Sequence, residues 1–189
     1  MCYGTTSNGC LKQGVKLPGS GTNFESYSSA ADLAGRTYVH SEVREIVVQA
    51  YKSLETGQPG KVFKYAEAGF KGSGEFKPHK THRNGLCVDF MVPVLNQQGE
   101  SEHLPAHLSN RPGYDIEFGD KGVYKQYTID YEALAVHIAA LHEASLSRGY
   151  HLWRVLFAPE LQANLFDTRC GAYLYRARTV FKTEIVGPA

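Results

Sequence analysis

Residues 86–95, LCVDFMVPVL, form a continuous apolar run that predicts a strand at the centre of a β-sheet. A single carboxylate, Asp89, interrupts the run, and its burial is costly unless a cation or hydrogen-bond donors satisfy it. Pro93 predicts that the end of this strand lies at a sheet edge or a bulge, because proline cannot donate to a ladder. The run therefore predicts a core strand with one carboxylate that needs a cation or hydrogen-bond donors as partners.

The segment before this run, PHKTHRNG at residues 78–85, places His79 and His82 in a loop. The chain can turn at the end of that loop and bring His82 and Asp89 to one face. Imidazole and carboxylate together are a ligand set suited to zinc. Two ligands do not make a site, so another interpretation stays open: His82 is a surface loop residue and Asp89 pairs with an arginine such as Arg154.

Working outward, the periodicity predicts an α+β fold with a small, mostly antiparallel sheet flanked by helices. Ser41 and Asp130 are the expected caps of two helices that each have an apolar face. A polar, turn-rich stretch at 96–120 predicts a long surface insertion, and such loops often border substrates. The other predicted elements are helices at 41–54 and 130–148, strands at 61–67 and 152–157, and a helical turn at 159–166.

The 189 residues suffice for one domain with a core. Residues 1–35 are rich in Gly, Ser, Thr and Asn and predict an irregular arm packed on a domain at 36–189. A net charge of +1 without a basic stripe argues against nucleic-acid binding, and no apolar run is long enough to span a membrane. The N-terminus lacks the pattern of a signal peptide. Of the four cysteines, Cys87 is expected to be a free buried thiol.

Most of the eight histidines are interpreted as structural. His103 and His107 have the i, i+4 spacing of a helical zinc pair, but Pro105 between them argues against a helix. His137 and His142 lie five apart on the second predicted helix, so they face different directions and are expected at the surface or the edge of the core. The metal hypothesis therefore concentrates on the loop before the apolar run.

The motif THRNGLCVD at 81–89, in which six residues separate His82 from Asp89, resembles the first zinc motif of a metallopeptidase superfamily. That superfamily comprises the lysostaphin, D-Ala-D-Ala metallopeptidase and hedgehog proteins, and the closer similarity is to penicillin-insensitive murein endopeptidases. His79, three residues before His82, also fits the pattern. Further similar segments are SNGC at 7–10, GRTY at 35–38 and WRVLFAPEL at 153–161.

This resemblance implies one zinc ion bound by His82, Asp89 and a histidine of a later His-x-His motif, with His79 as a catalytic residue beside the metal. It implies hydrolysis of D-alanyl cross-links between peptidoglycan stem peptides. A substrate of this kind implies a periplasmic or secreted protein, exported through a removed leader or delivered by a secretion machine into a rival cell. An immunity or inhibitor protein is the expected partner of such a toxin.

The chain departs from this pattern because it contains no His-x-His, and His151 is its last histidine. Three explanations stay open. The chain is a C-terminally incomplete form of an active enzyme, or it is a non-catalytic relative that retains a peptidoglycan-binding groove. In the third, the remaining ligand comes from His151, from a loop histidine or from a partner chain.

Overall fold

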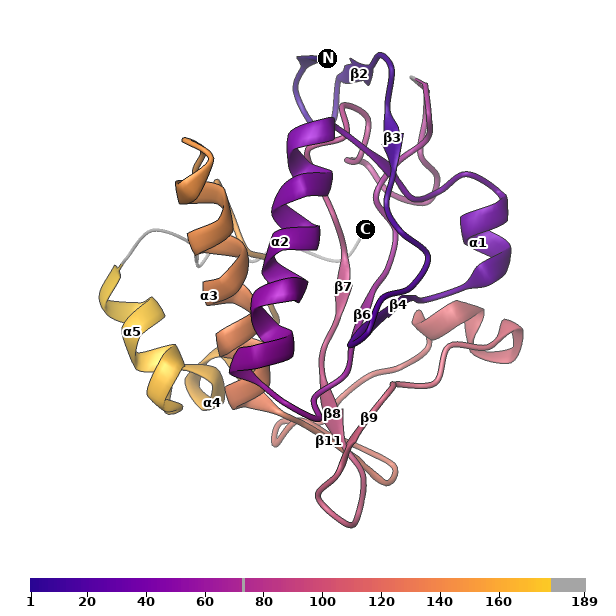
Figure 1. Ribbon diagram of the computed structural model, residues 1–189. Helices are drawn as coiled ribbons and strands as arrows, with labels where there is room; N and C mark the ends of the chain where they lie inside the picture. The colour runs from indigo at the N-terminus through magenta and orange to yellow at the C-terminus, as the bar shows by residue number, and fades with distance from the viewer. Residues whose placement is uncertain (73, 178–189) are drawn as a thin grey trace.

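The computed structural model describes residues 1–72 and 74–177 (Figure 1). These residues form an α+β fold of helices and several small, mostly antiparallel sheets, which confirms the fold class that the sequence predicts. None of the described helices is long and apolar enough to cross a membrane.

The three-stranded sheet β4–β6–β7 lies at the centre of the molecule and carries the candidate site. In it β6 pairs in parallel with β4 and antiparallel with β7. Helices α2 and α3 lie side by side over one face of this sheet, and Phe63, Tyr65 and Phe90 pack there with them (Figure 1). The strands are β4 (Phe24–Ser26), β6 (Phe63–Tyr65) and β7 (Phe90–Met91), and the helices are α2 (Ser41–Gly57) and α3 (Tyr131–Ser147).

The prediction of one strand over 86–95 is wrong, because this run forms two short strands in two different sheets. β7 belongs to the central sheet, whereas β8 (Val94–Leu95) joins a four-stranded sheet of order β10–β11–β8–β9. Pro93 lies between them without an N–H to donate, and its carbonyl accepts from the Asp130 N–H at 2.9 Å. The other strands of the second sheet are β9 (Ser101–Glu102), β10 (Val123–Tyr124) and β11 (Tyr127–Ile129).

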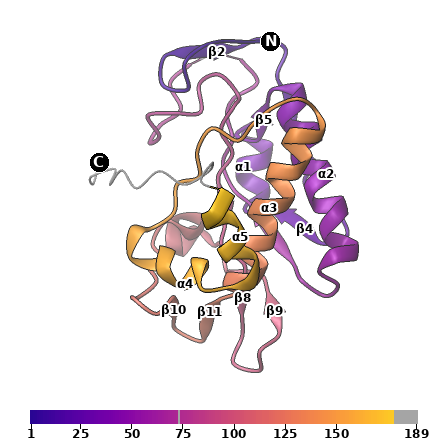
Figure 2. The same cartoon turned by 90° about the vertical axis from the view of Figure 1, so that its left-hand side faces the viewer.

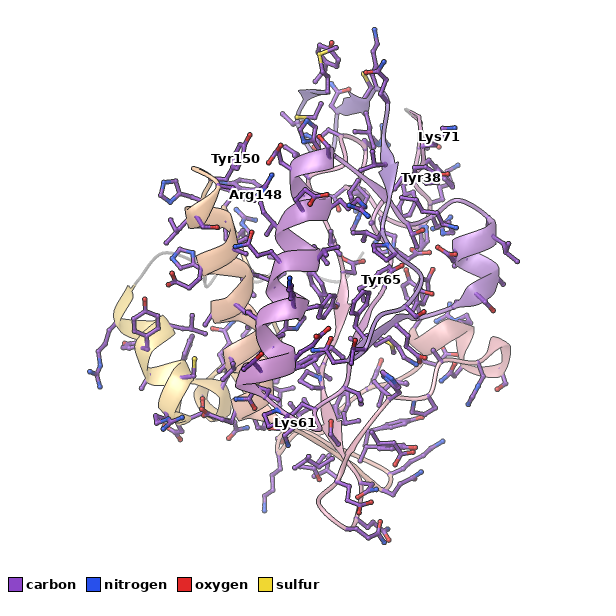
Figure 3. The ribbon with its side chains drawn as sticks, viewed as in Figure 1. Tyr38, Lys61, Tyr65, Lys71, Arg148 and Tyr150 are labelled. Atoms are coloured by element: carbon purple, nitrogen blue, oxygen red, sulfur yellow. The ribbon has the colours of Figure 1, made fainter. Side chains whose placement is uncertain are left out.

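The two long helices are confirmed, with one correction to their caps. Asp130 caps α3 as predicted, since its carboxylate accepts from the Ala133 N–H. The cap of α2 is His40 rather than Ser41, because the His40 Nδ1 accepts from an N–H of the first turn. The helices run antiparallel, and Arg148 lies at the end of α3, near the start of α2 (Figure 3). Its guanidinium donates two hydrogen bonds to Glu42 in the first turn of α2.

The first 35 residues hold more regular structure than the irregular arm that was predicted. β4 is a strand of the central sheet, and β3 pairs with β5. The Gly- and Ser-rich composition concealed these strands because pairing uses backbone groups, and a few apolar side chains such as Leu17 suffice to bury the segment. The elements are β1 (Cys2–Gly4), β2 (Gly9–Leu11), β3 (Val15–Lys16), α1 (Ser29–Leu33) and β5 (Tyr38–Val39).

The predicted strand at 152–157 is absent from the described part of the chain, and Trp153 and Leu156 are largely exposed. Within this run only Val155 takes part in a β-bridge, so the described residues form no continuous strand here. The turn at 159–166 is confirmed as a 3-10 turn, Pro159–Leu161, followed by α4 (Gln162–Phe166). Helix α5 (Arg169–Ala177), which the sequence did not predict, packs with α4 on α3 (Figure 2). Expectations for residues 178–189 lie outside the described residues.

Candidate metal centre

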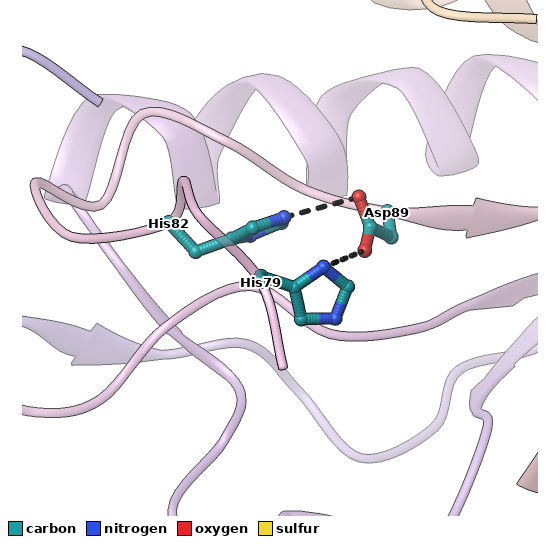
Figure 4. A group of neighbouring side chains, drawn as sticks. All are labelled: His79, His82 and Asp89. Atoms are coloured by element: carbon teal, nitrogen blue, oxygen red, sulfur yellow. Dashed lines mark ion pairs between the residues drawn. The ribbon is translucent and has the colours of Figure 1, made fainter. Parts of the chain in front are cut away.

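The three predicted site residues converge at the start of β7. His79 and His82 come from the loop before the strand, and Asp89 directly precedes it. One nitrogen or oxygen atom from each side chain lies within 4.8 Å of the other two. The His82 Nε2 is 3.2 Å from the Asp89 Oδ1, and the His79 Nδ1 is 3.8 Å from the Asp89 Oδ2 (Figure 4). No second group of this kind occurs within the described ranges.

The backbone fixes the orientation of the His82 ring. His82 is only 4% exposed, and its Nδ1 lies 2.9 Å from the Ala68 carbonyl. A carbonyl accepts only, so Nδ1 carries a proton and Nε2 is the atom that faces Asp89. Burial lowers the pKa of His82, but the hydrogen bond and charge of Asp89 and the Ala68 carbonyl outweigh it, so the pKa is raised. A cation at Nε2 therefore competes with a proton for the same position.

Glu67, just after β6, holds the His79 ring in a corresponding way. The His79 Nε2 donates to the Glu67 Oε2 at 2.6 Å, which leaves Nδ1 toward Asp89. The same carboxylate accepts from the Tyr114 hydroxyl at 2.7 Å, from the Tyr27 hydroxyl at 2.6 Å and from the Arg36 guanidinium. Burial raises the pKa of Glu67, but the hydrogen bonds from these donors lower the pKa by more than burial raises it. The pKa of Glu67 therefore lies well below its ordinary value.

An irregularity in the ladder between β6 and β7 directs Glu67 toward the site. The Ala66 N–H donates to the Asp89 carbonyl at 2.7 Å, and the Asp89 N–H donates to the Glu67 carbonyl at 2.8 Å. Two residues of one strand thus face one residue of the other, which is the pattern of a β-bulge. A bulge interrupts the alternation of side chains, and this explains how Glu67 reaches the same side of the sheet as Asp89.

Aromatic packing and a close backbone contact support the loop that carries both histidines. The ring of Phe76 lies against His79 and His82, with centroids 5.6 and 5.4 Å away. The Arg36 guanidinium covers that ring at 4.2 Å from its centroid. Gly69 contacts the loop from the other side, where an added Cβ would lie 2.8 Å from the His82 carbonyl oxygen. The donors are therefore held by contacts that do not require a metal.

Sequence reasoning identified His79, His82 and Asp89 but missed Glu67 and Tyr114. Glu67 ends the predicted strand 61–67, so its carboxylate at the end of a buried strand was the available signal. Tyr114 lies in the polar insertion, and its hydroxyl, 2.5 Å from the His79 Nε2, brings that insertion to the site. The alternative in which His82 is a surface residue is wrong, because His82 is buried.

The remaining histidines do not join the group. His137 and His142 are buried, at 2% and 7% exposed, rather than lying at the surface or the core edge. Both rings belong to α3 on the sheet side opposite the loop, and the His137 Nε2 has no hydrogen-bond partner among the described residues. His103 faces Glu25, with its Nε2 3.9 Å from the Oε1. Cys87 is a free thiol as predicted, but it is half-buried, and burial raises its pKa.

The chemistry of the donors fits a metal ion. Two imidazoles each have one nitrogen engaged by a fixed partner and the other turned toward a shared carboxylate, which is the usual arrangement of protein metal ligands. His79, His82 and Asp89 could therefore hold a metal ion. No protein-family model matches the chain, and no curated protein matches it either, so the geometry of these residues is the basis for any function.

Proposed function

We propose that the protein is a zinc-dependent peptidoglycan endopeptidase that hydrolyses D-alanyl cross-links between stem peptides. The observation that carries this proposal is the convergence of His79, His82 and Asp89, each positioned by the fold, on one point. Two imidazoles and one carboxylate form a set typical of catalytic zinc, which keeps a further position open for water or substrate. The resemblance of the motif around His82 supplies the substrate class, and a site in the bacterial periplasm or cell wall belongs to the same proposal.

In this proposal His82, through Nε2, and Asp89 are zinc ligands. The resemblance implies that His79 is a catalytic residue beside the ion, whereas in this proposal its Nδ1 takes the third ligand position in the described part of the chain. Bound zinc supplies a Lewis acid that polarises a peptide carbonyl and lowers the pKa of water to about 7. Glu67 keeps the proton on the His79 Nε2 and so maintains Nδ1 as a donor. Tyr114, 44% exposed, presents its ring at the mouth of the site.

The test combines metal analysis with a cleavage assay on purified muropeptide dimers joined by D-alanyl cross-links. The wild-type protein is expected to bind about one zinc and to cleave the dimers. His82→Ala and Asp89→Asn remove one ligand each, and we expect them to lose zinc and to reduce cleavage about 100-fold or more. The matched control is Asp120→Asn, which alters an exposed aspartate outside the site and should leave both readouts unchanged.

A protein without zinc whose stability does not change in chelator would contradict the metal assignment. Cleavage by His82→Ala at the wild-type rate would contradict the proposed chemistry even if zinc is present. If the chain is a secreted toxin, an immunity protein is expected to cover this site, and adding it would block cleavage.

A non-catalytic peptidoglycan-binding domain is the second candidate. One observation favours it: without a metal, His82 pairs with Asp89 and His79 with Glu67, so these side chains satisfy one another. A binding domain of this kind would sediment with purified sacculi while it leaves the cross-linked dimers intact, and chelator would not release it.

A further inference from the structure

A polar cleft of about 830 Å³ lies next to the metal centre, between α1, β4 and the segment 102–107. Tyr27 forms part of its wall, and the Tyr27 hydroxyl donates to Glu67, the carboxylate that also holds His79. A single carboxylate therefore separates the wall of this cleft from the candidate metal ligands. The lining of the cleft includes none of the candidate metal ligands, so the cleft and the metal centre are neighbouring sites with Tyr27 and Glu67 between them.

The pleat of the central sheet places the cleft and the metal centre on the same face. Lys64 on β6 lies opposite Met91 on β7 and beside Glu25 on β4. Asp89 precedes Met91 by two residues, so the two side chains point the same way. That face is the one away from the helices, because Phe63 and its neighbours fill the other. From strand spacings, the backbones of Asp89 and Lys64 are about 8 Å apart.

Two opposite charges lie at the floor of this cleft. The side chain of Lys64 is only 9% exposed, and its Nζ is 2.9 Å from the Glu25 Oε1 and 3.1 Å from the Leu104 carbonyl oxygen. An ammonium has three N–H donors, and within the described part of the chain these two acceptors engage two of them. The third donor and the Glu25 carboxylate, whose side chain is 43% exposed, are available to a ligand.

His103 completes the polar lining beside Glu25. Burial lowers the pKa of His103, with Glu25 raising it and Lys64 lowering it, and the net direction is down. The neutral form of His103 is therefore favoured. Lys64 and Glu25 present one cation and one anion side by side, and Glu102 adds a further carboxylate to the lining. A ligand with a single charge would be attracted by one of them and repelled by the other, whereas a ligand that carries both charges matches the pair.

We propose that this cleft is a subsite for a zwitterionic group of the substrate, that is, a carbon bearing both an ammonium and a carboxylate. Lys64 donates to the carboxylate and Glu25 accepts from the ammonium. Asp89 and Lys64 lie on the same face of the central sheet, so this group would bind within a few residues of the bond cleaved at the metal centre. The assignment rests on the proposed peptidase function for the peptide nature of the ligand.

The test measures binding rather than cleavage. Calorimetric titration of the zinc-loaded protein uses D-alanine as the probe, with N-acetyl-D-alanine and D-alanine amide as derivatives that keep one charge each. D-alanine is expected to bind, and each derivative to bind about tenfold more weakly or worse. Lys64→Met and Glu25→Gln are expected to weaken D-alanine binding by a similar factor, and Glu25→Gln alters a half-exposed side chain that folding tolerates.

Matched controls separate the cleft from the metal, since zinc can itself chelate an amino acid. Lys52→Met and Glu55→Gln alter exposed charges on α2 and should leave binding unchanged. His82→Ala removes a metal ligand but leaves the cleft intact. This variant should keep the component of D-alanine binding that depends on Lys64 and that Lys64→Met abolishes. Equal binding of D-alanine and its derivatives, or wild-type binding by both Lys64→Met and Glu25→Gln, would overturn the subsite. Binding without any hydrolysis of cross-linked dimers would instead contradict the proposed function and leave the subsite standing.

Discussion

At the scale of single residues, His137 is an ionisable group buried in the core. It is 2% exposed on α3, and its ring stacks on Tyr51 at 5.3 Å between centroids and lies 5.0 Å from that of Phe63. Its Nε2 has no hydrogen-bond partner among the described residues. Burial lowers the pKa of His137 to about 3, so the folded protein keeps this imidazole neutral where the unfolded chain protonates it.

This difference predicts a loss of stability in acid. Because the folded-state pKa lies below the unfolded value of about 6.5, the unfolded state binds more protons below that pH, and the free energy of unfolding falls as the pH falls from about 6.5 toward 3. The histidine accounts for about 3 kcal/mol between pH 7 and pH 4. Urea unfolding of wild type and His137→Leu over this range should show a shallower pH dependence for the variant.

The exposed His151 provides the control, because His151→Leu should follow the wild-type pH dependence. The comparison uses slopes rather than absolute stabilities, since His137→Leu also changes packing against the aromatic rings. Parallel curves for wild type and His137→Leu would show that another group governs acid unfolding.

The residues of the candidate site differ in how far the sequence could predict them. His82 and Asp89 were predictable because both belong to one short segment, and a carboxylate in an apolar run needs a partner. Glu67 was not predictable as a site residue. Its position at the site depends on a bulge opposite Asp89 and on hydrogen-bond donors from three other segments. Local spacing identifies the ligands, whereas the groups that orient them come together only through the fold.

At the scale of elements, the contact between Gly69 and the histidine loop positions the site. Gly69 pairs with Thr37 in a bridge, and a Cβ added to it would lie 2.8 Å from the His82 carbonyl oxygen and 3.1 Å from that of Tyr38. Both neighbours are backbone atoms, so no side-chain rotation relieves the contact. The loop can approach this closely only because residue 69 has no side chain.

Gly69→Ala is therefore expected to displace His82 and to reduce zinc affinity about tenfold or more, in the range measured when the support of a metal ligand is removed. The strain should also lower the free energy of unfolding by about 1–3 kcal/mol. Competition with a zinc chelator measures the first effect, and urea unfolding measures the second.

Gly57→Ala is the matched control, because no atom lies within 4 Å of a Cβ at that position at the end of α2. It should leave zinc affinity unchanged. Wild-type zinc affinity in Gly69→Ala would contradict the view that backbone contact with this glycine positions His82.

Helices were predictable from the sequence where apolar residues recur along one face. Short strands were less predictable. α2 and α3 have long apolar faces and caps, so their existence followed from local pattern. The run 86–95 was assigned to one strand because its composition is continuous, yet Pro93 divides it between two sheets. Strands of two or three residues, such as β3 and β7, are defined by pairing with distant segments, and composition alone does not reveal them.

At the scale of the whole molecule, the candidate metal centre joins parts that are remote in sequence. The central sheet brings β4 from the first 35 residues beside β6 and β7, and Tyr114 of the insertion 96–120 contacts His79 of the loop 76–85. The α+β class was predictable from the order of elements, but this arrangement was not, since a Gly- and Ser-rich segment gave no sign of a parallel strand.

A metal that bridges the histidine loop and the central sheet should stabilise the entire domain. Zinc binds the folded arrangement of His79, His82 and Asp89 in preference to the unfolded chain. At a free zinc concentration of 100 times the Kd, binding is expected to add about 2.7 kcal/mol to the free energy of unfolding. Thermal unfolding should shift upward with zinc concentration and return in chelator, and Asp89→Asn should lose the shift while Asp120→Asn keeps it. The shift should shrink in acid, because protons displace zinc from His82, whose pKa the neighbouring Asp89 helps to raise. A zinc-dependent shift of equal size in Asp89→Asn would place the metal elsewhere in the chain.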